Sequence, residues 1–329
     1  MEELARFVQL AAKQNASDIH LVAGSLPMMR VHRELKVLSK TMLTALTVKQ
    51  MIHTLLNQTQ IKQLDQSGDV DIGAVVADVG LRINVHKQSN GFALAIRLIS
   101  AKIPSPQELG FSEAVMNVPA LEDGLFVVSG PTGSGKSTTL ASLVQEMNTK
   151  SARHIITLED PIEYRFEAGT CLIEQRQLGV DFPTFQEGLR HVLRQDPDVI
   201  VVGEMRDPET IALALTAAET GHLVLSTLHA PNAAEVIERI VNVFQGAEQQ
   251  QILVQLAATM KMVVAQKLLP AKEGGVVVVQ EVLVNNLAVQ NAIRQNNLSV
   301  IRSAIQTGKK EGMIPMDRAI KELEKAGRI

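Results

Sequence analysis

In the first hundred residues of the chain, some segments have apolar residues at helical spacing and others have the pattern of strands. Apolar residues recur at helical spacing over 3–14 and 47–64, which predicts two helices. An Asn-Gly pair in Ser89-Asn90-Gly91 lies between two strand-like runs and predicts a hairpin. Residues 1–100 are therefore predicted to form a small α+β domain. Its expected strands lie at 17–22, 28–38, 70–76, 81–86 and 92–99.

A second pattern follows a proline-containing linker at 101–110. Short, wholly apolar runs with polar borders are typical of strands buried on both faces of a parallel sheet. Residues 111–329 are thus predicted to form a doubly wound α/β domain whose C-terminal part is mostly helical from about residue 231. The expected strands lie at 125–128, 154–158, 199–202 and 223–226, with an edge strand or hairpin at 276–279. The expected C-terminal helices lie at 233–244, 249–269, 298–305 and 316–326.

A glycine-rich segment after the run at 125–128 fits the phosphate-binding P-loop pattern G-x-x-x-x-G-K-[ST]. A strand, this loop and a helix in succession present backbone N–H groups and a helix N-terminus to an anion. We expect Lys136 to reach the β- and γ-phosphates of ATP and the Ser137 hydroxyl to bind Mg²⁺. The alternative is a glycine-rich turn that binds nothing. The expected nucleotide-binding residues are Gly130, Pro131, Thr132, Gly133, Ser134, Gly135, Lys136, Ser137 and Thr138.

Carboxylates follow two of the apolar strands. Glu204 comes one residue after a run of apolar residues, where an ATPase needs a carboxylate to hold Mg²⁺ and orient the attacking water. Glu159, Asp160 and Glu163 follow another apolar run and could polarise water or contact Mg²⁺ in a similar way. The alternatives are a solvated helix cap at Glu204 and a solvated turn at the other three acids.

One histidine and two arginines are further candidates. His229 follows the run at 223–226, and ligands of doubly wound sheets bind outside the carboxyl ends of the strands. It could hydrogen-bond a γ-phosphate there, or it could be structural. Arg82 and Arg97 lie on paired strands, and arginines stabilise the charge of a γ-phosphoryl group in the transition state. Their face could meet nucleotide in a neighbouring subunit, or it could be an ordinary solvated face.

The composition narrows the possible partners. A net charge of −3 and the absence of Trp provide neither a basic surface nor base-stacking platforms, so no nucleic acid is expected. The single cysteine, Cys171, excludes an internal disulfide and fits a reducing compartment. The N-terminus lacks the pattern of a signal peptide, and no apolar run approaches the ~20 residues that span a bilayer. We expect a cytoplasmic protein that reaches a membrane only through partners.

Four segments resemble the motifs of one family, the secretion-type ATPases of type IV pilus and type II secretion systems. GPTGSGKSTT, ITLEDPIEY, LRQDPDVIVVGEMRD and TGHLVLSTLHA match its Walker A loop, Asp box, atypical Walker B motif and His box, in that order. Near the N-terminus, KQNASDIHL resembles the signature of the PilT-like retraction ATPases of twitching motility. The resemblance covers nearly the whole chain.

This resemblance implies an N-terminal PAS-like domain, a RecA-like ATPase domain and a ring-shaped homo-hexamer, with nucleotide between the two domains. It implies that Glu204 of Walker B and Glu163 of the Asp box are the catalytic carboxylates, with Ser137 and Glu204 at the Mg²⁺ ion. The other residues implied by similarity are His222 and His229 of the His box, Arg82 and Arg97 of the N-terminal domain, and Arg194.

The implied function is a motor that hydrolyses ATP to power type IV pilus retraction, peripheral at the inner membrane and acting on a platform protein of the pilus. The short N-terminal domain and the single cysteine favour this type, because assembly ATPases carry a longer N-terminal region and usually a tetracysteine zinc site. Residues 291–298 keep the Ala-Ile-Arg of the retraction motif and then depart from it. The alternatives are a pilus assembly or type II secretion ATPase, an accessory retraction paralogue, a conjugation-type nucleic-acid translocase and a non-hydrolysing ATP-binding subunit.

Overall fold

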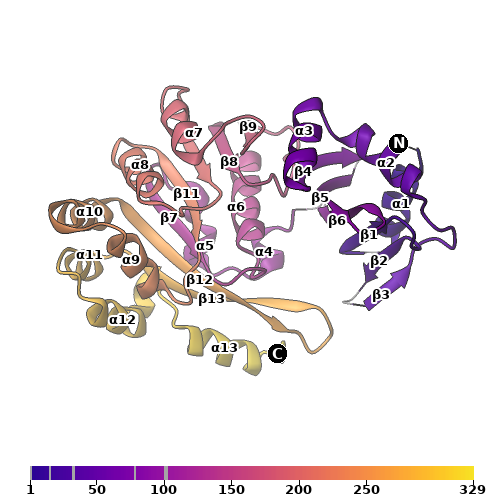
Figure 1. Ribbon diagram of the computed structural model, residues 1–329. Coiled ribbons are helices and arrows are strands. Elements are labelled where there is room, and N and C mark those ends of the chain that lie inside the picture. The colour runs from indigo at the N-terminus through magenta and orange to yellow at the C-terminus, as the bar shows by residue number, and fades with distance from the viewer. Residues whose placement is uncertain (1, 15, 32–33, 78, 100–102) are drawn as a thin grey trace. The chain divides into compact units, whose positions relative to one another are not determined.

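The chain divides into two units, each of which mixes helices with one β-sheet (Figure 1). The N-terminal unit comprises 1–102 together with 161–165, and the C-terminal unit comprises 103–160 and 166–329. No helix in the described part of the chain combines the length and hydrophobicity needed to cross a membrane. The structure is a computed structural model, and it describes residues 2–14, 16–31, 34–77, 79–99 and 103–329.

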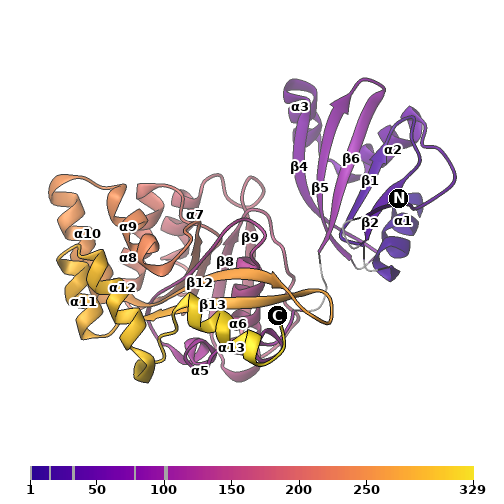
Figure 2. The same ribbon diagram turned by 90° about the horizontal axis from the view of Figure 1, so that it is seen from below.

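The N-terminal unit is a six-stranded antiparallel sheet with the strand order β3-β2-β1-β6-β5-β4. Three helices cover one face: Leu4 and Phe7 of α1 and Val48 of α2 pack with inward residues of the strands such as Ile19 and Ile83 (Figure 2). The residues between these inward positions form a second, largely polar face. The elements are α1 (Glu2–Lys13), β1 (Asp18–Val22), β2 (Met28–Val31), β3 (Glu34–Val37), α2 (Ala45–Leu55), α3 (Gln58–Ser67), β4 (Asp69–Val76), β5 (Val79–Gln88) and β6 (Gly91–Ile99).

Two elements of this unit that were predicted as continuous are divided in the structure. The expected strand at 28–38 forms the antiparallel pair β2 and β3. The expected helix at 47–64 forms α2 and α3, because Asn57 begins a new helix. The Asn57 side chain accepts a hydrogen bond from the Gln60 backbone N–H at 2.9 Å, and the Gln60 side chain accepts one from the Asn57 N–H at 3.0 Å. This capping box stabilises a helix start where the apolar spacing alone indicated a continuous helix.

A short helix, α4 (Pro106–Leu109), lies inside the segment 101–110 that was predicted as a linker. Residues 101–102 of that segment fall outside the described residues. Ser105 Oγ accepts a hydrogen bond from the Glu108 N–H at 3.2 Å, and a Glu108 carboxylate oxygen accepts one from the Ser105 N–H at 2.8 Å. With proline at the first helical position, this capping box stabilises a helical turn in the second half of the segment.

The C-terminal unit is a seven-stranded sheet with the strand order β13-β12-β7-β11-β10-β8-β9. Neighbouring strands are parallel, except that β12 and β13 form an antiparallel hairpin at one edge. The helices α5 and α6 cover one face, and α7 to α12 cover the other (Figures 1 and 2). The further elements are α5 (Glu113–Met116), η1 (Val118–Ala120), β7 (Gly124–Ser129), α6 (Lys136–Lys150), β8 (His154–Glu159), β9 (Leu172–Gln177), α7 (Phe185–Val192), β10 (Val199–Val202), α8 (Pro208–Glu219), β11 (Leu223–Leu228), α9 (Ala233–Asn242), α10 (Gly246–Thr259), β12 (Met260–Pro270), β13 (Val276–Val284), α11 (Leu287–Arg294), α12 (Leu298–Thr307), η2 (Lys309–Glu311) and α13 (Met316–Lys325).

Residues 260–270 form strand β12, so the prediction of a helix over 249–269 was wrong in its second half. The strand pairs in parallel with β7 and antiparallel with β13. Val263 and Val264 are both fully buried, in the apolar clusters on opposite faces of the sheet. A run that is apolar on all sides fits helical and strand periods equally well, so its pattern could not separate the two. The chain after residue 231 therefore supplies two strands of the sheet as well as helices.

The carboxyl ends of β7, β11, β10 and β8 meet at one edge of this sheet. Ser129, the last residue of β7, lies opposite Leu228, the last residue of β11. Val202, the last residue of β10, lies opposite Leu158 near the end of β8. The loops that follow these strands consequently leave the sheet side by side, which is where doubly wound folds place their ligands.

Candidate active site

The P-loop leaves the end of β7 and runs into α6. Gly130 and Gly135 have φ angles of +146° and +85°, which residues with a Cβ rarely adopt. A Cβ on Gly130 would also lie 2.4 Å from the backbone oxygen of Gln266 on β12, so the close approach of the two segments requires glycine there. The first helical residue of α6 is Lys136, so the positive end of the helix dipole lies at the loop.

Lys136 folds back over this loop. Its Nζ donates hydrogen bonds to the backbone oxygens of Gly130 at 3.0 Å and Pro131 at 3.1 Å. The ammonium group therefore adds a full positive charge beside the partial charge of the helix N-terminus. Ser137 and Thr138 follow in the first turn of α6 and are half-buried. Together these groups suit an anion with several oxygens, such as the phosphates of a nucleotide.

The backbone around Glu204 forms hydrogen bonds with both neighbouring strands. The Gly203 N–H donates to Leu158 O of β8 at 2.8 Å, and the Met205 N–H donates to Thr227 O of β11 at 3.2 Å. Thr227 Oγ1 also donates to Gly203 O at 2.6 Å. The carboxylate of Glu204 is thus carried by a fixed segment at the same sheet edge as the P-loop.

Arg206 and His229 lie on either side of the Glu204 carboxylate, whose side chain is 14% exposed. Arg206 forms an ion pair with Oε1, and His229 Nε2 lies 3.5 Å from Oε2. The hydrogen bond to Glu204, with a further attraction from Asp160, raises the pKa of Arg206 against the opposing effect of burial. Burial, together with the positive charge of Lys136, lowers the pKa of His229, and the attraction of Glu204 only partly offsets this. His229 is therefore neutral at pH 7, where its ring can donate one hydrogen bond and accept another.

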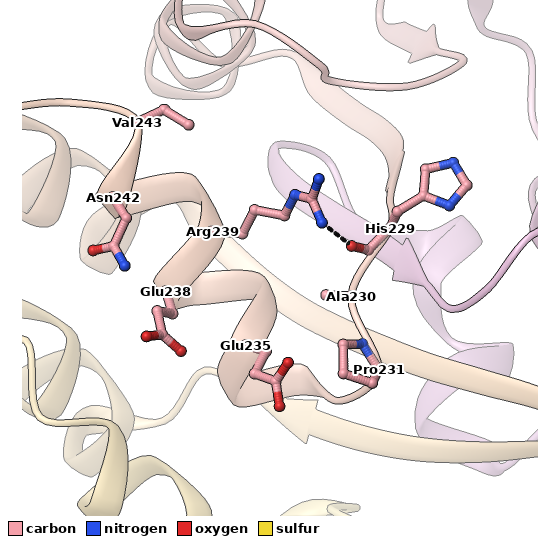
Figure 3. Close-up of a pocket in the computed structure, with 8 residues that line it drawn as sticks. All are labelled: His229, Ala230, Pro231, Glu235, Glu238, Arg239, Asn242 and Val243. Atoms are coloured by element: carbon pink, nitrogen blue, oxygen red, sulfur yellow. Dashed lines mark hydrogen bonds between the residues drawn. The ribbon is translucent and has the colours of Figure 1, made fainter.

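Arg239 of α9 fixes the backbone of His229 (Figure 3). Its Nη1 donates a hydrogen bond to the His229 backbone oxygen at 2.5 Å. Figure 3 shows the imidazole ring pointing away from Arg239, so the ring and the carbonyl lie on opposite sides of the chain. A cavity of about 340 Å³ lies between this loop and α9. The hydrogen bond from Arg239 restrains the peptide group that follows His229.

Three of the predicted site residues belong to the N-terminal unit. Glu163 is half-buried in the loop 161–165, which groups with that unit. Arg82 of β5 and Arg97 of β6 lie directly opposite one another in the antiparallel register. Arg97 Nε also forms an ion pair with Asp18 Oδ1 of β1 at 3.2 Å. The structure therefore brings the two arginines together on the polar face of the N-terminal sheet.

Two other predicted residues lie at the amino ends of the strands of the C-terminal sheet, away from the P-loop. His222 precedes β11, and its Nδ1 lies 3.0 Å from the Ala217 backbone oxygen and 3.2 Å from Thr220 Oγ1, near the end of α8. Arg194 lies exposed in the turn between α7 and the start of β10. Within this unit the structure does not bring His222 or Arg194 to the P-loop.

Three side chains enter the site without having been identified from the sequence. Arg206 carries a signal that could have been used, since it is a cation two residues after the strand-end carboxylate Glu204. No sequence pattern marks Arg239, because it donates a hydrogen bond to a backbone oxygen ten residues earlier in the chain. Gln266 lies in the segment that was predicted as helix, so its place beside the P-loop was not foreseeable.

The described residues contain no cluster of three or more His, Cys, Asp and Glu side chains that would hold a metal ion by itself. In phosphoryl-transfer sites Mg²⁺ is usually held by one or two protein groups together with phosphate oxygens and water.

The fold and the site define a P-loop nucleoside triphosphatase of the α/β class. A parallel sheet carries the phosphate loop after β7 and a carboxylate after β10, at a common edge. Over residues 1–300 the chain matches the family model of the type II/IV secretion system proteins, and it belongs to that family.

Curated relatives and a solved structure align along nearly the whole chain. The chain is 40% identical over 328 residues to the type IV pilus retraction ATPase PilT of Pseudomonas aeruginosa, covering 99% of this chain and 95% of the relative. It is 40% identical over 318 residues to a twitching motility protein of Neisseria gonorrhoeae, covering 96% and 85%. The crystal structure of the pilus retraction motor PilT with bound ADP matches with a TM-score of 0.92 at 39% identity, covering 99% of this chain and 94% of that one. The chain is accordingly an ATPase of this family.

Proposed function

We propose that this ATPase powers the retraction of type IV pili and works as a ring-shaped homo-hexamer. The similarity to a retraction ATPase along nearly the full length of both chains, in sequence and in fold, carries the proposal. A match confined to the C-terminal unit would support only the chemistry. Similarity that includes the N-terminal unit also supports the same mechanical output.

The two units are inferred to be a PAS-like and a RecA-like domain. In the C-terminal unit, the strand that leads to the P-loop, β7, is separated by β11 from β10, the strand that leads to Glu204. Helices cover both faces of that sheet. In the N-terminal unit, an antiparallel sheet carries its helices on one face. These arrangements support both assignments.

Residues 130–138 are proposed to bind the phosphates of ATP. Lys136 would pair with the β- and γ-phosphates, and the loop N–H groups would surround them. The loop fits such a ligand, because Ser134 Oγ is buried with no hydrogen-bond partner among the described residues, and a Cβ on Gly133 would meet nothing within 4 Å. Ser137 and Glu204 would hold Mg²⁺ through oxygen atoms, the donors that this ion prefers. When bound, Mg²⁺ neutralises charge on the phosphate oxygens.

Glu204 is proposed to orient the water that attacks the γ-phosphate, with Glu163 as a second carboxylate. Arg206 binds Oε1 of Glu204, while Oε2 faces His229. A carboxylate fixed in this way loses little freedom when it accepts a proton or a hydrogen bond from water. Neutral His229 would then serve as a hydrogen-bonding contact that responds to the γ-phosphate.

Arg82 and Arg97 are proposed to act on nucleotide held by a neighbouring subunit of the ring. Arg82 and Arg97 lie on one polar face of the sheet, so a single contact could engage both guanidinium groups. Guanidinium groups bind phosphate oxygens in a planar, two-pronged geometry. His222 and Arg194 are exposed or half-exposed at another edge of the fold, which is compatible with contacts between subunits rather than within one.

The motor is proposed to be cytoplasmic and peripheral at the inner membrane, where it would move a platform protein of the pilus. A conformational change driven by ATP hydrolysis would produce this displacement. No nucleic acid is expected in this cycle.

The test is the pilus phenotype of a strain that lacks this gene and is complemented with wild type, Lys136→Ala or Lys150→Ala. Both substitutions remove a lysine from α6, but Lys150 lies exposed at its far end. We expect excess, non-retracting pili with the empty vector and with Lys136→Ala. Wild type and Lys150→Ala should restore retraction.

Other outcomes would identify other functions. A surface without pili would indicate an assembly motor, and unchanged pili would indicate a secretion ATPase or an accessory paralogue. ATP turnover that rises severalfold with added DNA would instead support a nucleic-acid translocase. Purified wild type without turnover would indicate a non-hydrolysing subunit.

A further inference from the structure

Gln266 of β12 lies under the P-loop with its side chain buried, at 1% exposure. Its Nε2 donates a hydrogen bond to the backbone oxygen of Ser134, inside the loop, at 2.7 Å. Its Oε1 accepts one from Thr139 Oγ1, in α6, at 2.8 Å. A single amide thus binds both the phosphate loop and the helix that follows it.

The backbone of Gln266 shapes the same loop. Its carbonyl oxygen is the atom that a Cβ on Gly130 would approach to 2.4 Å, and its Nε2 would lie 3.4 Å from a Cβ on Gly135. Both ends of the Gly-rich segment therefore pack directly against this one residue. The contact with β12 therefore requires glycine at position 130, whereas at position 135 the left-handed φ of +85° is what favours glycine.

Gln280 fixes the orientation of the Gln266 amide. It lies directly opposite Gln266 on β13, and its Nε2 is 3.4 Å from Gln266 Oε1. With the oxygen facing two donors and the nitrogen facing a carbonyl, the reversed amide would place two oxygens against each other at Ser134. Leaving a buried polar group without a hydrogen bond destabilises the fold more than leaving an exposed one unpaired, because water cannot replace the missing partner. The observed orientation of the Gln266 amide is therefore strongly preferred.

This orientation determines where one N–H of the loop points. The peptide bond between Ser134 and Gly135 is planar and trans, so its C=O and N–H point in opposite directions. The Ser134 oxygen faces Gln266, and the Gly135 N–H consequently faces away from β12. If this peptide unit rotated, the loop would turn a carbonyl oxygen toward an anion in place of an N–H.

We propose that Gln266 is a positioning residue for nucleotide binding, which holds the Ser134–Gly135 peptide with its N–H directed at the phosphates. The proposal rests on the P-loop being the nucleotide site. This N–H would contact phosphate both before and during hydrolysis. Losing the contact would therefore weaken the binding of bound ATP and of the transition state by the same amount. Such a loss raises KM and leaves kcat nearly unchanged.

The test compares Gln266→Met and Gln266→Glu with Thr139→Val in the purified full-length protein. Gln266→Met keeps the approximate volume but cannot donate to Ser134. Gln266→Glu keeps an acceptor for Thr139 and, at a pH at which its carboxyl group is ionised, also loses the donor to Ser134. Thr139→Val is the matched control, since it removes the other hydrogen bond of the same amide and leaves Gln280 as a partner for Oε1.

Binding of a fluorescent ADP analogue and steady-state ATP hydrolysis are measured with Mg²⁺, alongside thermal unfolding. We expect both Gln266 variants to weaken ADP binding and raise KM by about tenfold, with kcat within about threefold of wild type. For Thr139→Val, the affinity for ADP, KM and kcat should each stay within about threefold of wild type. Wild-type binding and KM in both Gln266 variants would overturn the proposal, as would a fall in kcat at unchanged KM or the failure of both to fold.

Lys136→Ala separates this proposal from the one on which it rests. If Lys136→Ala binds ADP as wild type does, the P-loop is not the nucleotide site and the proposed function fails with it. If Lys136→Ala loses binding while both Gln266 variants keep it, only the role of Gln266 is wrong.

Discussion

At the residue scale, the two carboxylate oxygens of Glu204 have different surroundings. Oε1 is taken by Arg206, and Oε2 faces the imidazole of His229. Arg206 itself is 70% exposed, so the pair adds little to the stability of the fold. Its effect is on orientation, because a carboxylate with one oxygen held has fewer rotamers available to the other.

Arg206→Ala should therefore lower kcat by about tenfold while KM changes by less than about threefold. Arg206→Lys should fall between this variant and wild type, because lysine keeps the charge but lacks the planar fork of arginine. Steady-state ATP hydrolysis by the purified protein measures both constants. Arg302→Ala, at an exposed arginine of α12, is the control and should match wild type. A wild-type kcat in Arg206→Ala would refute this role.

At the element scale, α8 begins directly after the Glu204 segment and depends on Asp207 as its N-cap. The Asp207 carboxylate accepts hydrogen bonds from the Thr210 N–H at 2.8 Å, from Thr210 Oγ1 at 2.7 Å and from Gln186 Nε2 at 2.9 Å. Burial raises the pKa of Asp207, but the hydrogen bonds from Gln186 and Thr210 outweigh it and leave the pKa below the ordinary value of 3.8. The segment that carries Glu204 is thereby anchored at both of its ends.

Asp207→Ala should lower the free energy of unfolding by about 1 kcal/mol at pH 7, the usual effect of losing an N-cap. Because the pKa is lower in the folded state, the contribution is present above pH 3.8 and is lost as the pH falls through the folded pKa. Thermal unfolding of wild type and Asp207→Ala between pH 7 and pH 3 should show a difference that shrinks at the acid end. Asp65→Ala, at an acid of α3 with 69% side-chain exposure, should show almost no difference at any pH. A difference for Asp207→Ala that does not depend on pH would contradict a role for the ionised carboxylate as the cap.

The elements that local sequence determines were predictable, and those that distant contacts determine were not. The strand at 199–202 was confirmed, because a short apolar run between polar residues is typical of a strand buried on both faces. The helix predicted through 269 was wrong, since only pairing with β7 and β13 shows that 260–270 is extended. The same limit applies to the site. The P-loop could be located from eight consecutive residues, whereas the contact between Gln266 and Ser134 joins residues 132 positions apart.

At the scale of the whole molecule, ATP hydrolysis and pilus retraction rest on different kinds of evidence. The fold and the family establish an ATPase, and residues 130–138 with Glu204 are its proposed centre. Retraction is proposed from similarity along nearly the full length of the chain. The proposed link between the two is that hydrolysis at Glu204 sets the speed of retraction.

The most direct test is to image single labelled pili in the deletion strain complemented with wild type, Glu204→Gln or Glu209→Gln. Both substitutions remove one acidic charge near the start of α8, but Glu209 is exposed and outside the proposed site. We expect Glu204→Gln to slow retraction by at least about a hundredfold, the contribution expected of a general base, while pilus extension continues. Glu209→Gln should retract at the wild-type speed. Retraction at the wild-type speed with Glu204→Gln would contradict the proposed coupling of hydrolysis to retraction.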